Sequence, residues 1–202
     1  MGMDVKKRRK DMRDQILQVA LELFTRQGYD KTSLREIAER LEVSKAALYY
    51  HFMSKEEILR TLVAGIPRAF DDLVAWGESL PRSEESRKEI LRRLAALISE
   101  ELSPVLRFVQ ANSTAIEAVN GDGESMHDVV SSGLQRIGRI LVEPGSDLTD
   151  QIRAFTAANL IMMEMRPLLP AFGLEATPQR VSEVVLEIAL ELISKRQTTP
   201  GS

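Results

Sequence analysis

Cysteine is absent from this 202-residue sequence, which excludes disulfide bonds, thiolate catalysis and cysteine metal ligands. Histidine is scarce as well, with two residues in the whole chain. The sequence also lacks any run of about eighteen apolar residues, and no signal-peptide pattern opens it. We therefore expect a protein that neither spans a membrane nor is secreted, and we expect it in the cytoplasm.

The two histidines, His51 and His127, provide little for catalysis. Neither lies in a nucleophile elbow, a phosphate-binding loop or a metal-ligand motif. Glu124 and His127 have the spacing of half a di-iron carboxylate site, but the residue three before His51 is Leu48, which cannot bind a metal. We therefore expect no enzyme activity, no metal site and no cofactor.

The apolar residues recur at helical spacing without strand-like alternation, so we expect an all-α fold. Pro67 interrupts one apolar pattern, which predicts either a kinked helix or the start of a new one. Ser103 and Pro104 form the pattern of a helix cap and first turn, which predicts a new helix there. Helices are expected near residues 11–27, 34–41, 45–51, 55–76, 84–100, 104–119, 125–142, 148–165 and 178–195.

Two short helices with a tight turn between them are predicted from Ser33 to Lys55. Ser33 is suited to cap the first helix, and Glu36 three residues later completes a capping box. Ser44 is a second cap, followed by a helix to about His51. Two helices joined in this way have the geometry that places a recognition helix in the DNA major groove.

The second of these helices carries side chains suited to contact DNA. Ala46 and Ala47 are small enough for close approach to base edges, and an alanine methyl can meet a thymine methyl. Leu48 and Phe52, four residues apart, are expected to face inward. An alternative is that the aromatic residues of this helix belong to the core of a small helical domain. The candidate DNA-binding residues are Thr32, Ser33, Arg35, Ser44, Lys45, Ala46, Ala47, Tyr49, Tyr50, His51 and Lys55.

The run T-S-L-R-E-I-A-x-x-L-x-V-S-x-x-x-L-Y-Y-H-F-x-S-K-E-x-I-L, from Thr32 to Leu59, resembles the DNA-binding segment of TetR-type transcriptional regulators. The preceding F-x-x-x-G-Y-x-x-T, from Phe24 to Thr32, fits as well. One position departs from the family, because Glu42 stands in the turn where glycine is common. A positive φ at Glu42 would cost about 1–2 kcal/mol, so we expect a slightly different turn.

The resemblance implies a three-helix helix-turn-helix DNA-binding domain at residues 1–54, followed by a larger helical effector-binding and dimerisation domain at residues 55–202. It implies a ligand-responsive regulator, most often a repressor, that binds a palindromic operator in double-stranded DNA as a homodimer and is released by a small-molecule effector. A helical protein–protein adaptor without DNA binding is the alternative function, and a constitutive, effector-free DNA organiser is another.

The charges are distributed unevenly along the chain, whose net charge is −3. Residues 1–55 contain twelve Lys or Arg against eight Asp or Glu, whereas residues 56–202 contain fifteen against twenty-two. A basic N-terminal part suits phosphate contacts, which depend on local rather than total charge. Residues 6–10 are all basic, and we expect a disordered tail in the free protein that becomes ordered on DNA. Arg35 is expected either to contact DNA or to pair with Glu36 or Glu39.

The last two predicted helices carry more apolar surface than one core face requires. The simplest partner is the same pair of helices from a second copy, and this agrees with what the resemblance implies. The alternative is a central helix that is buried on all sides in a monomer. The candidate dimer residues are Phe155, Ala158, Met162, Val181, Val184, Val185, Ile188 and Leu192.

The middle of the chain contains large apolar residues that are candidates to line an effector cavity, although the same residues also suit an ordinary core. Arg166 is a candidate to meet an anionic group of the effector, or to cap the C-terminus of its helix. The candidate ligand-binding residues are Trp76, Phe108, Met126, Met162 and Arg166.

Overall fold

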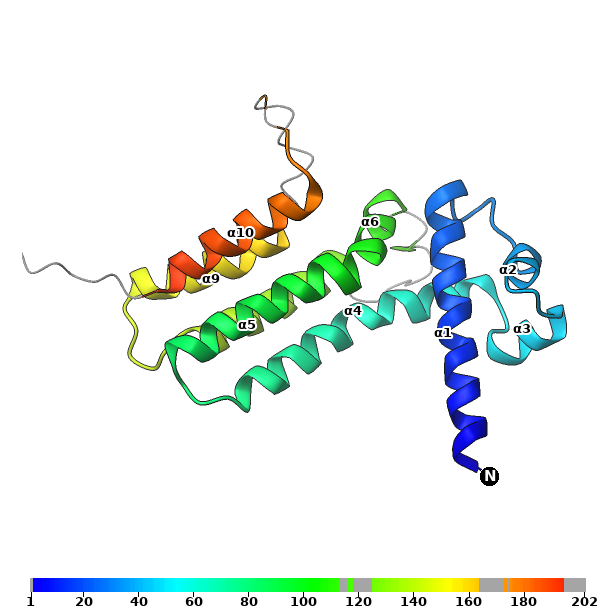
Figure 1. Ribbon diagram of the computed structural model, residues 1–202, viewed down its shortest axis with the longest axis horizontal. Coiled ribbons are helices and arrows are strands. Elements are labelled where there is room, and N and C mark those ends of the chain that lie inside the picture. Colours follow the sequence, from blue (N-terminus) through cyan, green and yellow to red (C-terminus); the bar gives the residue numbers. More distant parts are fainter. Residues whose placement is uncertain (1, 113–115, 118–124, 164–172, 174, 195–202) are drawn as a thin grey trace, which may run out of the picture. The chain divides into compact units, whose positions relative to one another are not determined.

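The computed structural model describes residues 2–112, 116–117, 125–163, 173 and 175–194, and this part of the chain is helical, with no strand. Its elements begin with α1 (Gly2–Gln27), α2 (Leu34–Arg40) and α3 (Lys45–His51), as Figure 1 shows. The remaining elements are α4 (Lys55–Glu78), α5 (Glu84–Ala96), the π-helix η1 (Leu97–Leu102), α6 (Ser103–Ala111), α8 (Met126–Leu141), α9 (Leu148–Met162) and α10 (Pro178–Ile193). The expected all-α fold is confirmed.

The chain forms two compact units, and each unit is built from two separate stretches of the sequence. The N-terminal unit comprises Met1–Ile66 and Ser103–Met126, and the C-terminal unit comprises Pro67–Leu102 and His127–Ser202. These units are defined by packing, whereas the expected boundary between residues 54 and 55 separates functions. That functional division stays a prediction.

The first helix is longer than expected, because α1 begins at Gly2 and includes the basic run at residues 6–10 in its backbone. The expectation of a disordered tail therefore does not describe this structure. Ile16, Ala20 and Phe24 are buried on one side of α1, at the spacing of an amphipathic helix. Within the N-terminal unit, α1 packs against α2 and α6.

Serine caps fix the beginnings of α2, α3 and α4. The Ser33 hydroxyl accepts from the Glu36 N–H at 3.2 Å, and the Ser33 N–H donates to the Glu36 carboxylate at 2.7 Å, which confirms the capping box. Ser44 caps α3 by accepting from the Ala47 N–H at 3.1 Å. Ser54 accepts from the Glu57 N–H at 3.1 Å at the start of α4. Each cap satisfies a backbone donor that the helix itself leaves unpaired.

The turn between α2 and α3 differs from the expectation, because Glu42 has a φ of 56°. Two hydrogen bonds hold it there: Glu42 N–H donates to Glu39 O at 3.1 Å, and Val43 N–H donates to Ala38 O at 3.0 Å. This is the Schellman arrangement, in which the residue after the cap takes the left-handed conformation. The expected alternative turn is therefore wrong. The turn keeps a geometry that favours glycine, at a cost of about 1–2 kcal/mol for a side chain.

Pro67 lies inside α4 and neither ends the helix nor begins another one. A proline inside a helix removes one backbone hydrogen bond, the one that residue 67 would donate to the Val63 carbonyl. The helix is nevertheless buried along one side before and after this point, by Ile66 and Phe70 among others. The expected possibility that a new helix starts at Pro67 is therefore excluded.

The helix predicted at Ser103 is confirmed, because α6 begins there, but α5, η1 and α6 follow one another without a loop. The π-helix η1 separates the buried residues Leu97 and Leu102 by five positions, where an α-helix would use three or four. Pro104 follows directly, and its ring would clash with the carbonyl four residues earlier in a regular α-helix. The wider π turn makes room for that ring.

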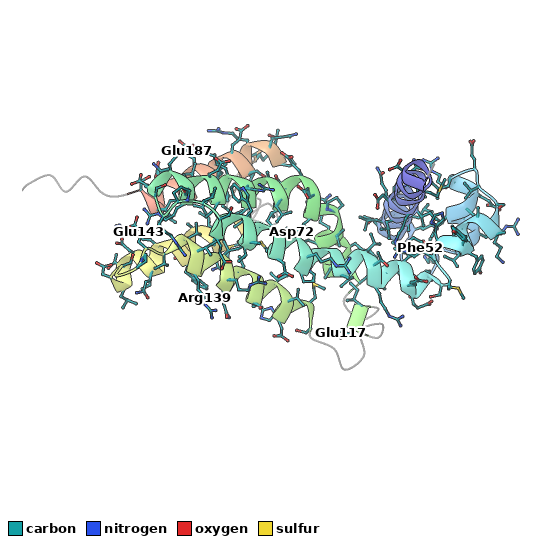
Figure 2. All side chains as sticks on the ribbon, turned by 90° about the horizontal axis from the view of Figure 1, so that it is seen from below. Phe52, Asp72, Glu117, Arg139, Glu143 and Glu187 are labelled. Carbon is teal, nitrogen blue, oxygen red and sulfur yellow. The ribbon has the colours of Figure 1, made fainter. Side chains whose placement is uncertain are left out.

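The C-terminal unit contains a helix pair, α9 and α10, which lie side by side in Figure 1. Both helices pack on α5. Elsewhere in this unit Gly133 of α8 lies so close to Phe70 that an added Cβ would stand 2.7 Å from its ring. Charged side chains such as Asp72, Arg139 and Glu187 are exposed on the surface of this unit, and Figure 2 labels them. Among the residues that the structure describes, no helix is long and apolar enough to cross a membrane.

Candidate nucleic-acid interface

The helix α3 has two sharply different sides. Leu48 and Phe52 are completely buried, as expected, and Figure 2 shows Phe52 among the helices of the N-terminal unit. Tyr50 is 66% exposed and Met53, in the turn that follows, is 78% exposed. We call the exposed residues of this segment the reading face: Lys45, Ala46, Ala47, Tyr49, Tyr50 and Met53. The alternative that the tyrosines are core aromatics is wrong for Tyr50.

Arg13 of α1 holds the end of α3 in place. Its guanidinium lies 4.4 Å from the centre of the Phe52 ring, in cation–π geometry. It donates to the His51 carbonyl at 3.5 Å and to the Thr61 hydroxyl at 3.4 Å. The His51 carbonyl belongs to the last turn of α3, where helices leave acceptors unsatisfied and favour positive charge. One side chain therefore connects α1, α3 and α4.

Lys55, a candidate DNA contact, has partners inside the protein. Its Nζ donates to the Tyr29 carbonyl at 2.8 Å and lies 4.1 Å from the centre of the Tyr29 ring. The Tyr29 hydroxyl donates to the Glu56 carboxylate at 3.4 Å. Burial, together with the nearby negative charge of Glu56, raises the pKa of Tyr29 to about 12. These contacts fix the end of α1 to the start of α4.

The candidates near the start of α2 differ in exposure. Thr32 is 2% exposed, and its hydroxyl donates to the Gly28 carbonyl at 2.9 Å, so the side chain closes the end of α1. Ser33 is exposed. Arg35 is exposed as well, but it pairs with Glu39 at 2.7 Å, which is one of the two alternatives expected for it. Hydrogen bonds from Ser33 lower the pKa of Glu36, so this cap is formed by the ionised carboxylate.

The candidate ligand-binding residues have other contacts. Phe108 of α6 is fully buried and stacks on Phe24 of α1, with ring centroids 5.7 Å apart. Trp76 is half-buried, with the Arg93 guanidinium 4.4 Å from its ring centre. Met126 and Met162 are half-buried at the beginning of α8 and the end of α9. Arg166 lies outside the described residues.

An apolar stripe is exposed along α9. It comprises Leu148, Ile152, Phe155 and Met163, which are 70%, 55%, 50% and 55% exposed. Ala158 is fully buried, so its side chain packs within its own chain and not on the exposed side of the helix. On α10, Ile188 is 43% exposed. The other candidate dimer residues of the two helices are half-buried: Met162, Val181, Val184, Val185 and Leu192.

The sequence of the N-terminal unit is similar to the sequences of known transcriptional regulators. The profile of the family described as "Bacterial regulatory proteins, tetR family" matches residues 16–62, which include α2, α3 and the start of α4. The HTH-type transcriptional regulator TcmR of Streptomyces glaucescens is 47% identical over 58 residues, covering 29% of this chain and 26% of TcmR. Residues 16–62 of this chain are thus similar to the tetR family of bacterial regulatory proteins.

Two further proteins are similar to a larger share of this chain. A Staphylococcus epidermidis protein, the icaADBC negative regulator IcaR, is 32% identical over 111 residues, 55% of this chain and 58% of IcaR. A crystal structure of a transcriptional regulator from Aquifex aeolicus has a similar fold, with a TM-score of 0.63 and 22% identity, over 90% of this chain and 99% of that one. The chain thus spans from a quarter to little more than half of the curated relatives it matches.

Several exposed residues were not among those predicted from the sequence. Met53 was not a candidate, although it directly follows the inward Phe52 and so had to face away from the core. Leu148, Ile152 and Met163 were also missed. Together with Phe155 they recur at steps of four, three and eight residues, which is the spacing of one helix face. That periodicity was visible in the sequence.

Proposed function

We propose that this chain is a DNA-binding transcriptional regulator that acts as a homodimer on double-stranded DNA. The observation that best supports this proposal is the reading face of α3, whose exposed side chains lie opposite the fully buried Leu48 and Phe52. A helix with such a face, preceded by a second helix and a tight turn, suits insertion into the major groove. Repression is the proposed direction of regulation, since IcaR is a negative regulator.

Charge supports the same proposal. The first 55 residues carry a net charge of +4, twelve basic against eight acidic, and the basic residues at 6–10 belong to α1. Positive charge in a part of the chain that contacts DNA releases counterions on binding and makes the affinity depend on salt. The remaining residues are net acidic, which disfavours their lying on DNA.

The stripe on α9 supports a homodimer. Four large apolar side chains at least half exposed on one helix face are unusual for a surface that meets only water. A second copy of the same face is the simplest cover, and a two-fold axis there gives two copies of α3. Such a dimer would bind the two halves of a palindromic operator about 34–36 Å apart.

Effector release completes the proposal. Residues 1–54 would bind DNA, and residues 55–202 would form the dimer and bind a small-molecule effector, in the cytoplasm. The effector would favour a spacing of the two α3 helices that no longer matches the operator. Similarity to the TetR family supports this part, and Trp76, Phe108, Met126, Met162 and Arg166 remain the candidate ligand contacts.

Fluorescence anisotropy with DNA from the promoter region of the chain's own gene tests DNA binding. Affinity should fall steeply as salt rises, because each phosphate contact releases counterions. Lys45→Ala and Tyr50→Ala should weaken binding while the far-ultraviolet circular dichroism stays unchanged. Gln135→Ala, at an exposed position of α8, is the control that should bind like wild type. A flat salt response, or no binding at low salt, would contradict the proposal and favour a protein–protein adaptor.

A further inference from the structure

The reading face is poor in the side chains that usually distinguish bases by hydrogen bonds. Bidentate contacts use arginine or lysine for guanine and asparagine or glutamine for adenine. The segment from Ser44 to Met53 contains no arginine, asparagine or glutamine, so Lys45 is its one residue of these types. The Lys45 Nζ lies 5.5 Å from the centre of the Tyr49 ring. Of the two arginines of α2, Arg35 pairs with Glu39 at 2.7 Å and Arg40 lies 3.9 Å from the Glu22 carboxylate.

The same face is rich in exposed apolar groups. Ala46 and Ala47 are exposed, Tyr50 presents two thirds of its surface, and Met53 presents more than three quarters. Ala46 and Tyr50 are four residues apart and therefore neighbours on the helix surface. The helix cannot rotate to hide them, because Leu48 and Phe52 on the opposite side are fully buried.

These groups fit one chemical feature of the major groove. The C5 methyl group of thymine is the apolar mark that distinguishes one base there. Two adjacent alanines let the helix backbone approach closely, and an unbranched methionine adapts its shape to a neighbouring methyl. We propose that α3 selects its operator chiefly through thymine methyl groups, contacted by Ala46, Ala47, Tyr50 and Met53. This inference rests on the proposed DNA binding and adds Met53 as a residue that determines specificity.

The experiment removes the methyl groups and nothing else. Operators are first selected from a random DNA pool with the full chain, and each thymine in the selected half-sites is then replaced by deoxyuridine. Base pairing and hydrogen-bonding edges stay the same. Anisotropy should show an affinity loss of about fourfold for each thymine that faces α3, as expected for burial of one methyl group.

Variants separate direct contact from changes in DNA shape. In Met53→Ala and Tyr50→Ala, the ratio between the affinities for thymine and deoxyuridine operators should shrink, since the contacting group is gone. In Lys45→Ala, both affinities should fall by the same factor and the ratio should stay. The Met53→Ala substitution leaves the core intact, because Met53 is 78% exposed.

Three outcomes would overturn the inference. Tight, sequence-selective binding that ignores deoxyuridine would refute methyl recognition and leave the proposed function intact. A ratio that stays constant in every variant would show that the methyl groups act through DNA shape. Absence of any DNA binding would remove the proposed function itself, and this inference with it.

Discussion

The protein exposes apolar side chains in two places that are built differently. The reading face on α3 combines small alanines, tyrosines with polar tips and one methionine, over a helix of seven residues. The stripe on α9 consists of Leu148, Ile152, Phe155 and Met163, none of which has a hydrogen-bonding tip, and most of it lies on a helix of fifteen residues. The reading face and the stripe on α9 therefore differ both in length and in polarity.

This difference indicates two kinds of partner. Aromatic side chains with hydroxyl groups suit a surface that stays partly wet, as a DNA groove does. Purely aliphatic and phenyl surface suits a dry interface with another protein helix. The two faces also differ in what lies behind them, since α3 is fixed by Arg13 and by the Ser44 cap, whereas α9 is backed by small residues such as Ala154, Ala157 and Ala158.

The largest effect is expected from the buried side of α3. Leu48→Ala should lower the free energy of unfolding by about 2–5 kcal/mol, because it removes a fully buried side chain and leaves a cavity. Tyr50→Ala on the opposite side should change it by about 0.5 kcal/mol or less. Urea denaturation followed by circular dichroism measures both. A larger loss in Tyr50→Ala than in Leu48→Ala would reverse the two faces assigned to this helix.

The next effect concerns the stripe on α9. Phe155→Glu places a charge in the middle of the proposed dry interface and should raise the dimer dissociation constant about 30-fold or more, as loss of a central aromatic contact does. Thr149→Glu, at an exposed position of the same helix outside the stripe, is the matched control and should leave the constant unchanged. Sedimentation velocity across a dilution series gives both values. Equal behaviour of the two variants would argue against this face as the interface.

A smaller effect is expected in the turn before α3. Glu42→Gly should stabilise the protein by about 1 kcal/mol or less, because glycine takes the left-handed conformation without a Cβ penalty but loses more entropy on folding. Glu42→Ala keeps the Cβ and should give no such gain. Thermal unfolding of the three proteins compares them. If alanine stabilised as much as glycine, the charge of Glu42 would be the cause rather than its backbone.

The last effect is absent at neutral pH and appears only at high pH. The pKa of Tyr29 is raised from 10.0 to about 12, so the folded state favours the neutral phenol that donates to Glu56. This stabilisation is complete below pH 10 and is lost as the pH rises towards 12. Tyr29→Phe keeps the ring beside Phe24 but cannot ionise. Urea denaturation at several pH values should show wild type losing stability relative to this variant in that window, and parallel curves would contradict the raised pKa.

Local patterns in the sequence predicted what local interactions decide. The caps at Ser33 and Ser44 and the inward positions of Leu48 and Phe52 depend on neighbours within a few residues, and all were confirmed. The prediction of a different turn at Glu42 was wrong, because two backbone hydrogen bonds offset the strain of the left-handed conformation. The strain of about 1–2 kcal/mol is similar in size to the contribution of two backbone hydrogen bonds, about 0.5–1.5 kcal/mol each.

Other features depend on residues far apart in the sequence. The stacking of Phe24 on Phe108 joins positions 84 residues apart, and nothing near either one indicates it. Arg13 likewise meets the end of α3 at a distance of 38 residues. The candidate list for DNA binding agreed with exposure at most positions but included Thr32, whose hydroxyl turns back to Gly28. A sequence pattern states which residue types are present, whereas burial depends on the tertiary packing.

The π-helix η1 has a consequence for the length of the chain. Ser99, Glu100 and Glu101 are exposed between the buried Leu97 and Leu102. Deleting one of the three would leave a four-residue step, which ordinary α geometry accommodates with both leucines still inside. The ring of Pro104 would then press on the preceding turn. The extra residue of the π-helix and Pro104 are therefore interdependent. A relative that has lost the extra residue should also carry a different residue in place of Pro104.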